Sequence, residues 1–423
     1  MTVFNPENPI DLGHRQRDGS LLSLDPAERR RHLYTIGSTG SGKTTFLQSL
    51  ILQDINRGAG VCVIDPHGDM AKRIASSIPR HRINETVYLD TSDIDFPIGF
   101  NPLAGWPDRD DQERVALSIV STFKSLWRDS WGEWLDYLLK NTMLALMKTE
   151  AKAVSLASVN RMLEDARYRA TIVSGIKDPI LRRFWLDNFE EKSERDRLTE
   201  IRSTINKAGK WTQSTILRNI VCQPRSGFSI EKIMDEGGIL IVNLSKGTFT
   251  EDNTNLLGSL LVSEITSRAM QRARLVEDER RDFHLYIDEF QNFTTDNFAT
   301  IVSEARKYRL CLSIAHQEFD QIDPKVRSAI LKNAGTLAAF RVNFDDAEKL
   351  AASFRPIQTG ELSSTNIGDF WCRPPGSGAV LCRAHGPALQ EQCYLNSLRR
   401  VQNASRERYG RPRRKVEADF ARW

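Results

Sequence analysis

The segment LYTIGSTGSGKT, residues 33–44, runs an apolar strand directly into a glycine-rich loop. Gly37, four further residues and then Gly42-Lys43-Thr44 give the spacing of a phosphate-binding loop. Backbone N–H groups of such a loop converge on phosphates, Lys43 would reach the β- and γ-phosphates, and Thr44 would hold Mg²⁺. A helical pattern follows as far as Gly58, which disfavours a glycine turn that binds nothing. The predicted nucleotide-binding residues are Gly37, Ser38, Thr39, Gly40, Ser41, Gly42, Lys43, Thr44 and Thr45.

Composition is that of an ordinary globular protein with room for two or three domains. Of the 423 residues, 40% are apolar and 27% charged, and the net charge of +4 is too small to indicate nucleic acid by itself. No apolar run approaches the length that spans a bilayer, and the N-terminus lacks a secretory signal. The six cysteines form no CxxC pair. We therefore expect a reduced, cytoplasmic protein, and any place at the inner membrane would be peripheral and come through partners.

Further apolar runs predict a mostly parallel sheet. Residues 1–32 read as a solvated lead-in with a basic patch at 29–32, and strands are expected at 61–64 and 86–89. Asp65 follows the first of these strands. It either lies near the nucleotide or a neighbouring subunit, or it serves as a turn residue, with Asp69 capping the next helix.

The pattern becomes helical from about residue 108 to 233, with breaks expected at Gly132, Pro179 and Gly209. Six of the eight tryptophans fall within residues 106–211, so we expect an all-α insertion with its own core. Its basic residues either contact nucleic acid or form a solvated face, the second being favoured. These are Lys192, Arg195, Arg197, Arg202, Lys207 and Lys210. The expected division is a nucleotide-binding domain at 1–105 and 237–398, the insertion at 106–236 and a basic tail at 399–423.

The sheet resumes at Gly238, and strand 284–287 ends in Asp288-Glu289, a Walker B arrangement. Asp288 would orient Mg²⁺ through its water shell, and Glu289 would align and deprotonate the attacking water. Gln317 follows the next strand, and it either senses the γ-phosphate or holds the attacking water, or it only caps a turn. Arg306 is the candidate for an arginine supplied by a neighbouring subunit, with Arg341 as runner-up and an ordinary surface arginine as the alternative.

The C-terminal part predicts a hairpin of strands 379–383 and 390–395 at a sheet edge. Zinc binding by its cysteines and His385 is disfavoured, because the spacing fits no common knuckle and strand alternation explains the cysteines. The tail from 399 to 415 is strongly basic and is either disordered or a non-specific phosphate contact. Lys246, after strand 239–242, is a candidate pore residue.

With these motifs in order, residues 10–395 resemble the HerA/FtsK superfamily of ring-forming DNA-pumping ATPases, and within it the cytoplasmic part of type IV secretion coupling proteins. The motifs that carry the resemblance are GSTGSGKTT (37–45), VIDPHGDM (63–70), GFNPLAG (99–105), VNLSKG (242–247), YIDEFQNF (286–293), EARKY (304–308) and SIAHQ (313–317).

The resemblance implies a RecA-like core, an inserted all-α domain, and a homohexamer that threads DNA through its channel using ATP and Mg²⁺. Coupling proteins usually carry an N-terminal transmembrane region, which this sequence lacks. The expected function is therefore a DNA translocase, serving conjugative transfer or feeding DNA to a nuclease or defence protein. The alternatives are an adaptor that docks a relaxase, nuclease or secretion channel, and a nucleotide switch; use of GTP is disfavoured by the lack of an NKxD motif.

Overall fold

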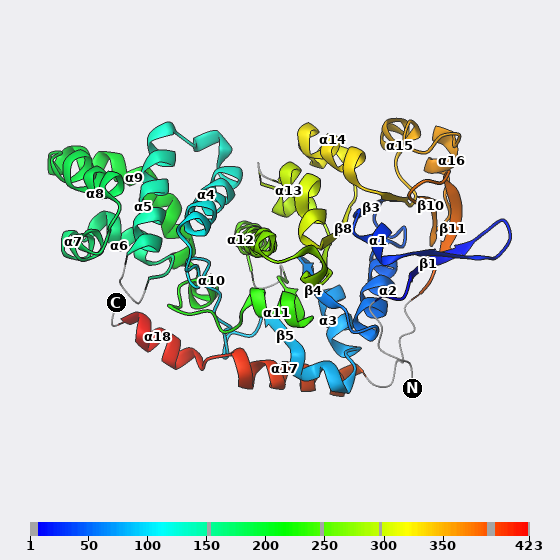
Figure 1. The fold of residues 1–423 in the computed structure, drawn as a ribbon, viewed down its shortest axis with the longest axis horizontal. Coiled ribbons are helices and arrows are strands. Elements are labelled where there is room, and N and C mark those ends of the chain that lie inside the picture. The colour runs from blue at the N-terminus through cyan, green and yellow to red at the C-terminus, as the bar shows by residue number, and fades with distance from the viewer. Residues whose placement is uncertain (1–6, 150–153, 246–248, 296–297, 387–393, 422–423) are drawn as a thin grey trace. The chain divides into compact units, whose positions relative to one another are not determined.

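The computed structural model describes residues 7–149, 154–245, 249–295, 298–386 and 394–421 (Figure 1). The chain divides into two compact units, each assembled from separate stretches. The sheet unit comprises Met1–Leu89, Ile230–Lys246 and Arg268–Ser405. The helical unit comprises Asp90–Ser229, Gly247–Ser267 and Arg406–Trp423. Thus the stretch between the first two of the three sheet segments starts at residue 90, whereas the sequence placed the start of the insertion at 106, and two later segments join the helical unit.

The sheet unit is built on one eleven-stranded sheet, with the order β2-β1-β11-β10-β9-β3-β8-β7-β4-β6-β5. Strands β9, β3, β8, β7, β4 and β6 pair in parallel in that order. Almost every residue of these strands is buried, as expected for a sheet covered on both faces. The strands are β3 (Leu33–Ile36), β4 (Gly60–Asp65), β5 (Thr86–Asp90), β6 (Ile239–Asn243), β7 (Phe283–Ile287), β8 (Leu310–His316) and β9 (Thr336–Ala339).

An antiparallel extension continues the sheet beyond β9. Strands β10 (Asp369–Arg373) and β11 (Val380–Ala384) form a hairpin, which β1 (Ile10–Arg15) and β2 (Leu21–Leu24) extend. A C-terminal hairpin is therefore present, but the strand near residue 380, β11, pairs with the preceding strand β10 and not with the expected later strand. The strand expected at 390–395 falls largely outside the described residues, and Tyr394 begins a helix.

The expected solvated lead-in is wrong, because β1 and β2 are strands and Arg29 is buried. Arg29 donates hydrogen bonds to Asp54 at 3.0 Å, to Tyr286 at 2.9 Å and to Nδ1 of His284 at 3.1 Å. From the sequence alone, a run of three arginines indicates an exposed basic surface, because the distant residues that pair with Arg29 are not known. Here tertiary pairing supplies the compensation that a buried charge requires.

Helices pack around the sheet, and their apolar side chains join those of the strands in one core that includes Phe46, Ile51 and Met70. The helices are α1 (Pro26–Arg29), α2 (Lys43–Asn56), α3 (Asp69–Ser76), α11 (Ile230–Glu236), α13 (Phe298–Glu304), α14 (Pro324–Asn333), α15 (Phe344–Ala351) and α16 (Thr359–Ser363). The short helical turn η7 (Ala305–Tyr308) directly precedes Arg309 and β8.

Helix α17 (Tyr394–Tyr409) covers the edge strand β5. The Ser405 hydroxyl accepts a hydrogen bond from Tyr88 N at 2.8 Å and donates to Tyr88 O at 3.4 Å, and Val401 is buried in the core. Together with α18 (Arg413–Ala421), this shows that residues 394–421 form two helices joined by a short link and are not a disordered end. The exposed basic side chains of this region are Arg399, Arg400, Arg408, Arg414 and Lys415.

The helical unit has its own core, in which Phe123, Trp185 and Trp211 are almost fully buried. Its helices are α4 (Arg109–Leu126), α5 (Glu133–Lys148), α6 (Ser158–Glu164), α7 (Ala166–Ser174), α8 (Pro179–Arg183), α9 (Glu194–Gln213), α10 (Thr215–Val221) and α18, with most of α12 (Glu251–Gln271). Gly209 does not break a helix, because burial of Ala208 and Trp211 offsets the roughly 1 kcal/mol that glycine costs inside α9. In the part of the chain that the structure describes, no helix is long and apolar enough to cross a membrane.

Candidate nucleotide-binding site

The glycine-rich loop joins β3 to α2 at the carboxyl edge of the parallel strands. Gly42 adopts φ +114° before the first turn of α2. At Gly37 a Cβ atom would lie 2.6 Å from Phe340 Cβ, so only glycine fits. Thr44 and Thr45 are exposed at the start of α2, where backbone N–H groups favour anions.

Lys43 is buried against its own loop. Its ammonium group donates to Gly37 O and, at 3.3 Å, to Ser38 O. Burial lowers the pKa of Lys43, while the nearby Glu289 and Asp288 carboxylates act to raise it. A lysine folded onto loop carbonyls beside open anion-binding N–H groups fits a phosphate ligand.

Asp288 and Glu289 follow β7, two strands away from β3, and both are buried. Burial, together with the charges of Glu289 and Asp65, raises the pKa of Asp288 well above the usual range of a carboxyl group. The buried pair Asp288 and Glu289, with Lys43 for compensation, fits a divalent cation, which would favour the ionised form of Asp288. Glu289 has φ +48° and ψ +49°, a strained backbone for a non-glycine residue, and such strain is often found at functional sites.

A chain of hydrogen bonds links the loop to Glu289. Thr39 Oγ1 donates to Gln317 Oε1 at 2.8 Å, and Gln317 Nε2 donates to Glu289 Oε1 at 2.6 Å. The other carboxylate oxygen, Oε2, accepts from Gln291 Nε2 at 2.8 Å. The structure thus brings together the loop, the acidic pair and Gln317, which the sequence placed on three different strands.

Asp65 serves as a turn residue, one of its two expected roles. Its carboxylate accepts hydrogen bonds from His67 N and Ala71 N, both at 2.9 Å, at the start of α3. Its charge still contributes to the raised pKa of Asp288, so Asp65 also shapes the electrostatics of the site.

Arg306 lies far from this site within one chain. It is exposed on η7, at the amino end of β8, whereas Gln317 follows the carboxyl end of that seven-residue strand. The strand alone separates them by about 20 Å at ~3.3 Å per residue. The runner-up, Arg341, is adjacent to the loop, because its carbonyl oxygen accepts from Ser38 N at 2.8 Å and from Ser38 Oγ at 3.0 Å.

Two contributors to the site escaped the sequence analysis. Gln291 lies two residues after Glu289 and clamps its carboxylate, and Gly368 N donates to Ser41 O at 2.9 Å. Proximity to the acidic pair was the only signal for Gln291. Gly368 comes from a segment more than 300 residues after the loop, and no local pattern connects the two.

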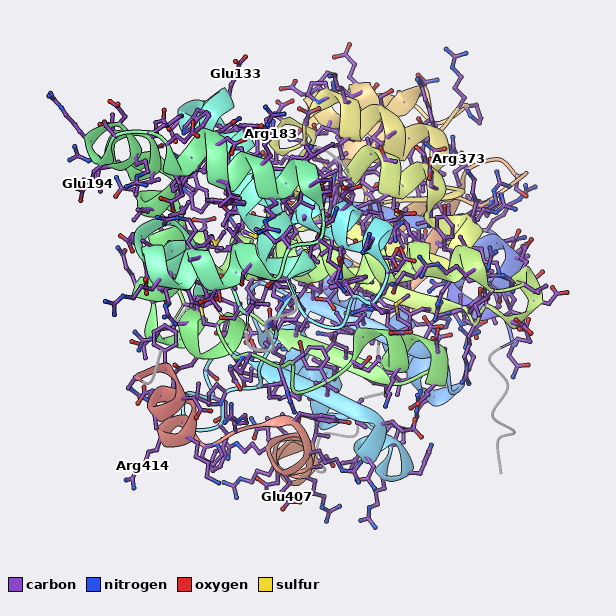
Figure 2. The ribbon with its side chains drawn as sticks, turned by 60° about the vertical axis from the view of Figure 1, so that its left-hand side comes forward. Glu133, Arg183, Glu194, Arg373, Glu407 and Arg414 are labelled. Carbon is purple, nitrogen blue, oxygen red and sulfur yellow. The ribbon has the colours of Figure 1, made fainter. Side chains whose placement is uncertain are left out.

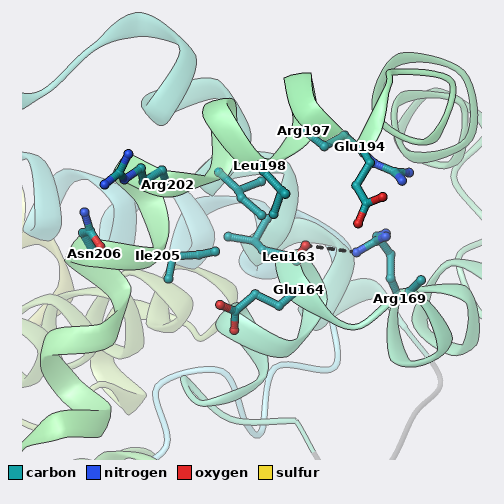
Figure 3. Close-up of a pocket in the computed structure, with 11 residues that line it drawn as sticks. Leu163, Glu164, Arg169, Glu194, Arg197, Leu198, Arg202, Ile205 and Asn206 are labelled. Carbon is teal, nitrogen blue, oxygen red and sulfur yellow. Dashed lines mark hydrogen bonds between the residues drawn. The ribbon is translucent and has the colours of Figure 1, made fainter.

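The helical unit holds a separate cavity of about 610 Å³ between α6, α7 and α9 (Figure 3). Leu163, Leu198, Ile201 and Ile205 give it apolar walls, and 57% of Leu198 is exposed. Arg169 on its rim donates to Leu163 O at 3.1 Å and also pairs with Glu190. Other charged side chains of this unit, such as Glu133, Arg183 and Glu194, stand out from their helices (Figure 2).

Several of the basic residues that were candidates for nucleic acid contact have acidic partners. Lys192 pairs with Glu200 at 2.7 Å, Lys210 pairs with Asp252 at 3.1 Å, and Arg197 pairs with Glu190. This pairing is typical of a solvated helix face. In the sheet unit, Cys372 and Cys382 are buried on neighbouring strands, whereas Cys393 and Lys246 lie outside the described residues.

The sequence matches two family profiles. Residues 10–265 match the profile described as "Helicase HerA, central domain", and residues 282–354 match the one described as "TraM recognition site of TraD and TraG". No curated protein matches the chain.

Solved structures share the fold at low sequence identity. The plasmid coupling protein TrwB with ADP and Mg²⁺ is 19% identical, with TM-score 0.64 over 88% of this chain and 90% of that one. TrwB with the GTP analogue GDPNP is 20% identical, with TM-score 0.63 over 86% and 87%. VirB4 of Thermoanaerobacter pseudethanolicus is 15% identical, with TM-score 0.60 over 92% and 100%. The RecA-like α/β fold expected from the motifs is confirmed.

Proposed function

Because the chain belongs to the HerA helicase central-domain family, we propose that it is a P-loop ATPase that moves DNA as a ring of identical subunits, six by the family resemblance. The observation that carries the proposal is the placement of Glu289. Two side-chain amides hold its carboxylate, and one of them also contacts the phosphate loop.

The residues of one chain divide the work of hydrolysis. The loop N–H groups and Lys43 bind the phosphates of ATP, and Glu289 accepts a proton from the attacking water. Gln317 couples the conformation of the phosphate loop to the position of the Glu289 carboxylate, since its amide contacts both. Thr44 and Asp288 would hold Mg²⁺, which neutralises charge on the phosphates when bound. Arg306 lies at the amino edge of the sheet, opposite to the edge that holds the site of its own chain. It would therefore serve the nucleotide of a neighbouring subunit.

Conjugative DNA transfer is the process we propose. Residues 282–354 match the TraM recognition profile of TraD and TraG, and TrwB is titled a plasmid coupling protein. A motor that feeds DNA to a nuclease or defence protein is the second candidate. The cavity of the helical unit favours a docking role in either process, with a relaxase, nuclease or secretion channel as the partner.

ATP turnover measured with and without DNA tests the proposal, together with the mass of the particle in solution. DNA should raise turnover, and ATP with DNA should convert the protein into a ring. Turnover that ignores DNA in a protein that stays monomeric would refute the motor.

Deleting the helical unit is too disruptive to test docking, so Leu198→Glu is preferable, because it places a charge in the exposed apolar wall of the cavity. Loss of partner capture with unchanged DNA-stimulated turnover supports docking there. Capture that survives the substitution excludes this cavity as the docking site.

A further inference from the structure

The turn that carries Arg306 is held by the segment just before β7. Arg309 closes the turn with φ +57°, and its N–H donates to Arg306 O at 3.1 Å. This left-handed conformation is unfavourable for a residue with a Cβ. Contacts from elsewhere must therefore maintain it.

Asp282 supplies one of those contacts. Its carboxylate lies 3.6 Å from Arg309 Nη1 and accepts from Arg30 Nε at 2.9 Å through both oxygens. The side chains of Asp282 and Arg309 are only 16% and 13% exposed. Arg309 is thus anchored to a carboxylate that is itself fixed by Arg30.

The main chain and a second arginine complete the clamp. Phe283 N, next to Asp282, donates to Arg309 O at 2.9 Å, and the guanidinium of Arg280 donates to Lys307 O. The carboxyl-terminal end of the turn, at Lys307 and Arg309, is therefore tied to residues 280–283. The same segment leads into β7, and Asp288 and Glu289 directly follow that strand.

We propose that Asp282 is a positioning residue for Arg306, acting through Arg309 to fix the turn that presents Arg306 to a neighbouring subunit. The inference rests on the proposed trans role of Arg306. It also makes β7 a direct link between the acidic pair of a subunit's own site and the arginine that the subunit offers to the next site.

The size of the interaction separates this role from a structural one. Asparagine keeps the size of Asp282 and one acceptor oxygen for Arg30, so the substitution Asp282→Asn should leave the fold intact. Displacing a transition-state cation by about 1 Å is far more costly, on the order of 100-fold in rate. A positioning role therefore predicts a large loss of turnover with a small loss of stability.

Mixed assemblies of Asp282→Asn with Lys43→Ala test the inference. Alone, Asp282→Asn should lower kcat at least tenfold, with KM for ATP changed less than twofold and Tm within a few degrees of wild type. Mixed with Lys43→Ala, which keeps its own Arg306 turn, it should regain turnover. Mixed with Arg306→Ala it should not, because neither partner presents the arginine. Asp278→Asn, an exposed acid four residues earlier, is the control and should match wild type.

The remaining outcomes would overturn either the positioning role of Asp282 or the ATPase proposal. Wild-type kcat in Asp282→Asn overturns the inference, and so does a defect that Lys43→Ala fails to rescue. If Arg306→Ala keeps full turnover while Lys43→Ala is inactive, the positioning role is overturned and the ATPase proposal stands. If Lys43→Ala keeps full turnover, the ATPase proposal itself fails.

Discussion

Gln317 donates a hydrogen bond of 2.6 Å to Glu289, although 28 residues separate them in the sequence. The contact arises because β7 and β8 pair in parallel and both residues follow the carboxyl ends of their strands. Gln317 also accepts from Thr39, so a single amide connects the phosphate loop to the residue assigned to the attacking water.

Glu289→Gln should abolish ATP hydrolysis while leaving ATP binding intact. The amide has nearly the same shape and still accepts hydrogen bonds, but it does not take a proton from water. We expect turnover to fall by a factor of 100 or more, measured as phosphate release, with nucleotide affinity within a few-fold of wild type. Unaffected hydrolysis would remove the proposed role of Glu289.

Gln317→Ala should lower turnover about tenfold, less than the loss in Glu289→Gln, because Glu289 keeps its hydrogen bond from Gln291. Either amide can partly hold the carboxylate alone, so the double variant Gln291→Ala/Gln317→Ala, which frees both oxygens, should lose more turnover than the product of the two single losses. A double-mutant cycle of kcat values measures this coupling. Additive effects of the two amides would indicate that they do not act on the same carboxylate.

Lys43→Ala should weaken ATP binding and reduce hydrolysis at least 100-fold, because the phosphates lose their buried counter-charge. Lys72→Ala, an exposed lysine on α3, is the matched control and should leave both unchanged. Fluorescent nucleotide titration and phosphate release check the two quantities separately.

Asp288→Asn should stabilise the nucleotide-free protein even as it abolishes Mg²⁺-dependent turnover. The pKa of Asp288 is raised in the folded state, so its contribution to stability is present at low pH and is lost as pH rises through that pKa. The variant should therefore gain about 1–3 kcal/mol at pH 8 and less at pH 5, as measured by urea unfolding. Asp65→Asn, which weakens the acceptor of two backbone N–H groups, should instead be destabilising.

Mild acid should destabilise the sheet unit through its buried histidines. Burial lowers the pKa of His32 and of His284 to about 4 and that of His316 to about 3, so each takes up a proton on unfolding. Stability should fall as pH drops from about 6.5 towards 4, by up to about 1.4 kcal/mol per pH unit for each histidine. Urea unfolding of Asp288→Asn at pH 7, 6 and 5 isolates this slope from the opposing effect of Asp288. Equal stability at the three pH values would contradict it.

How much the sequence predicted depends on how local each signal was. The phosphate loop, the parallel strands and the acidic pair were predictable, because each is a short motif attached to an apolar strand. Strands β1, β2 and β10 were missed, since the strands of this antiparallel extension mix polar and apolar residues and lie among turns. The burial of Arg29 was missed because its partners Asp54 and Tyr286 lie 25 and 257 residues away.

The hydroxyl of Ser405 occupies both the N–H and the C=O of Tyr88 on the last strand of the sheet. An open strand edge is a template on which other chains assemble, and natural proteins shield such edges. Helix α17 therefore shields this edge from intermolecular strand pairing, and it also presents basic side chains to the solvent. A protein truncated before this helix would expose the edge of β5 and should aggregate. Its poor solubility would then not indicate a loss of ATP binding or hydrolysis.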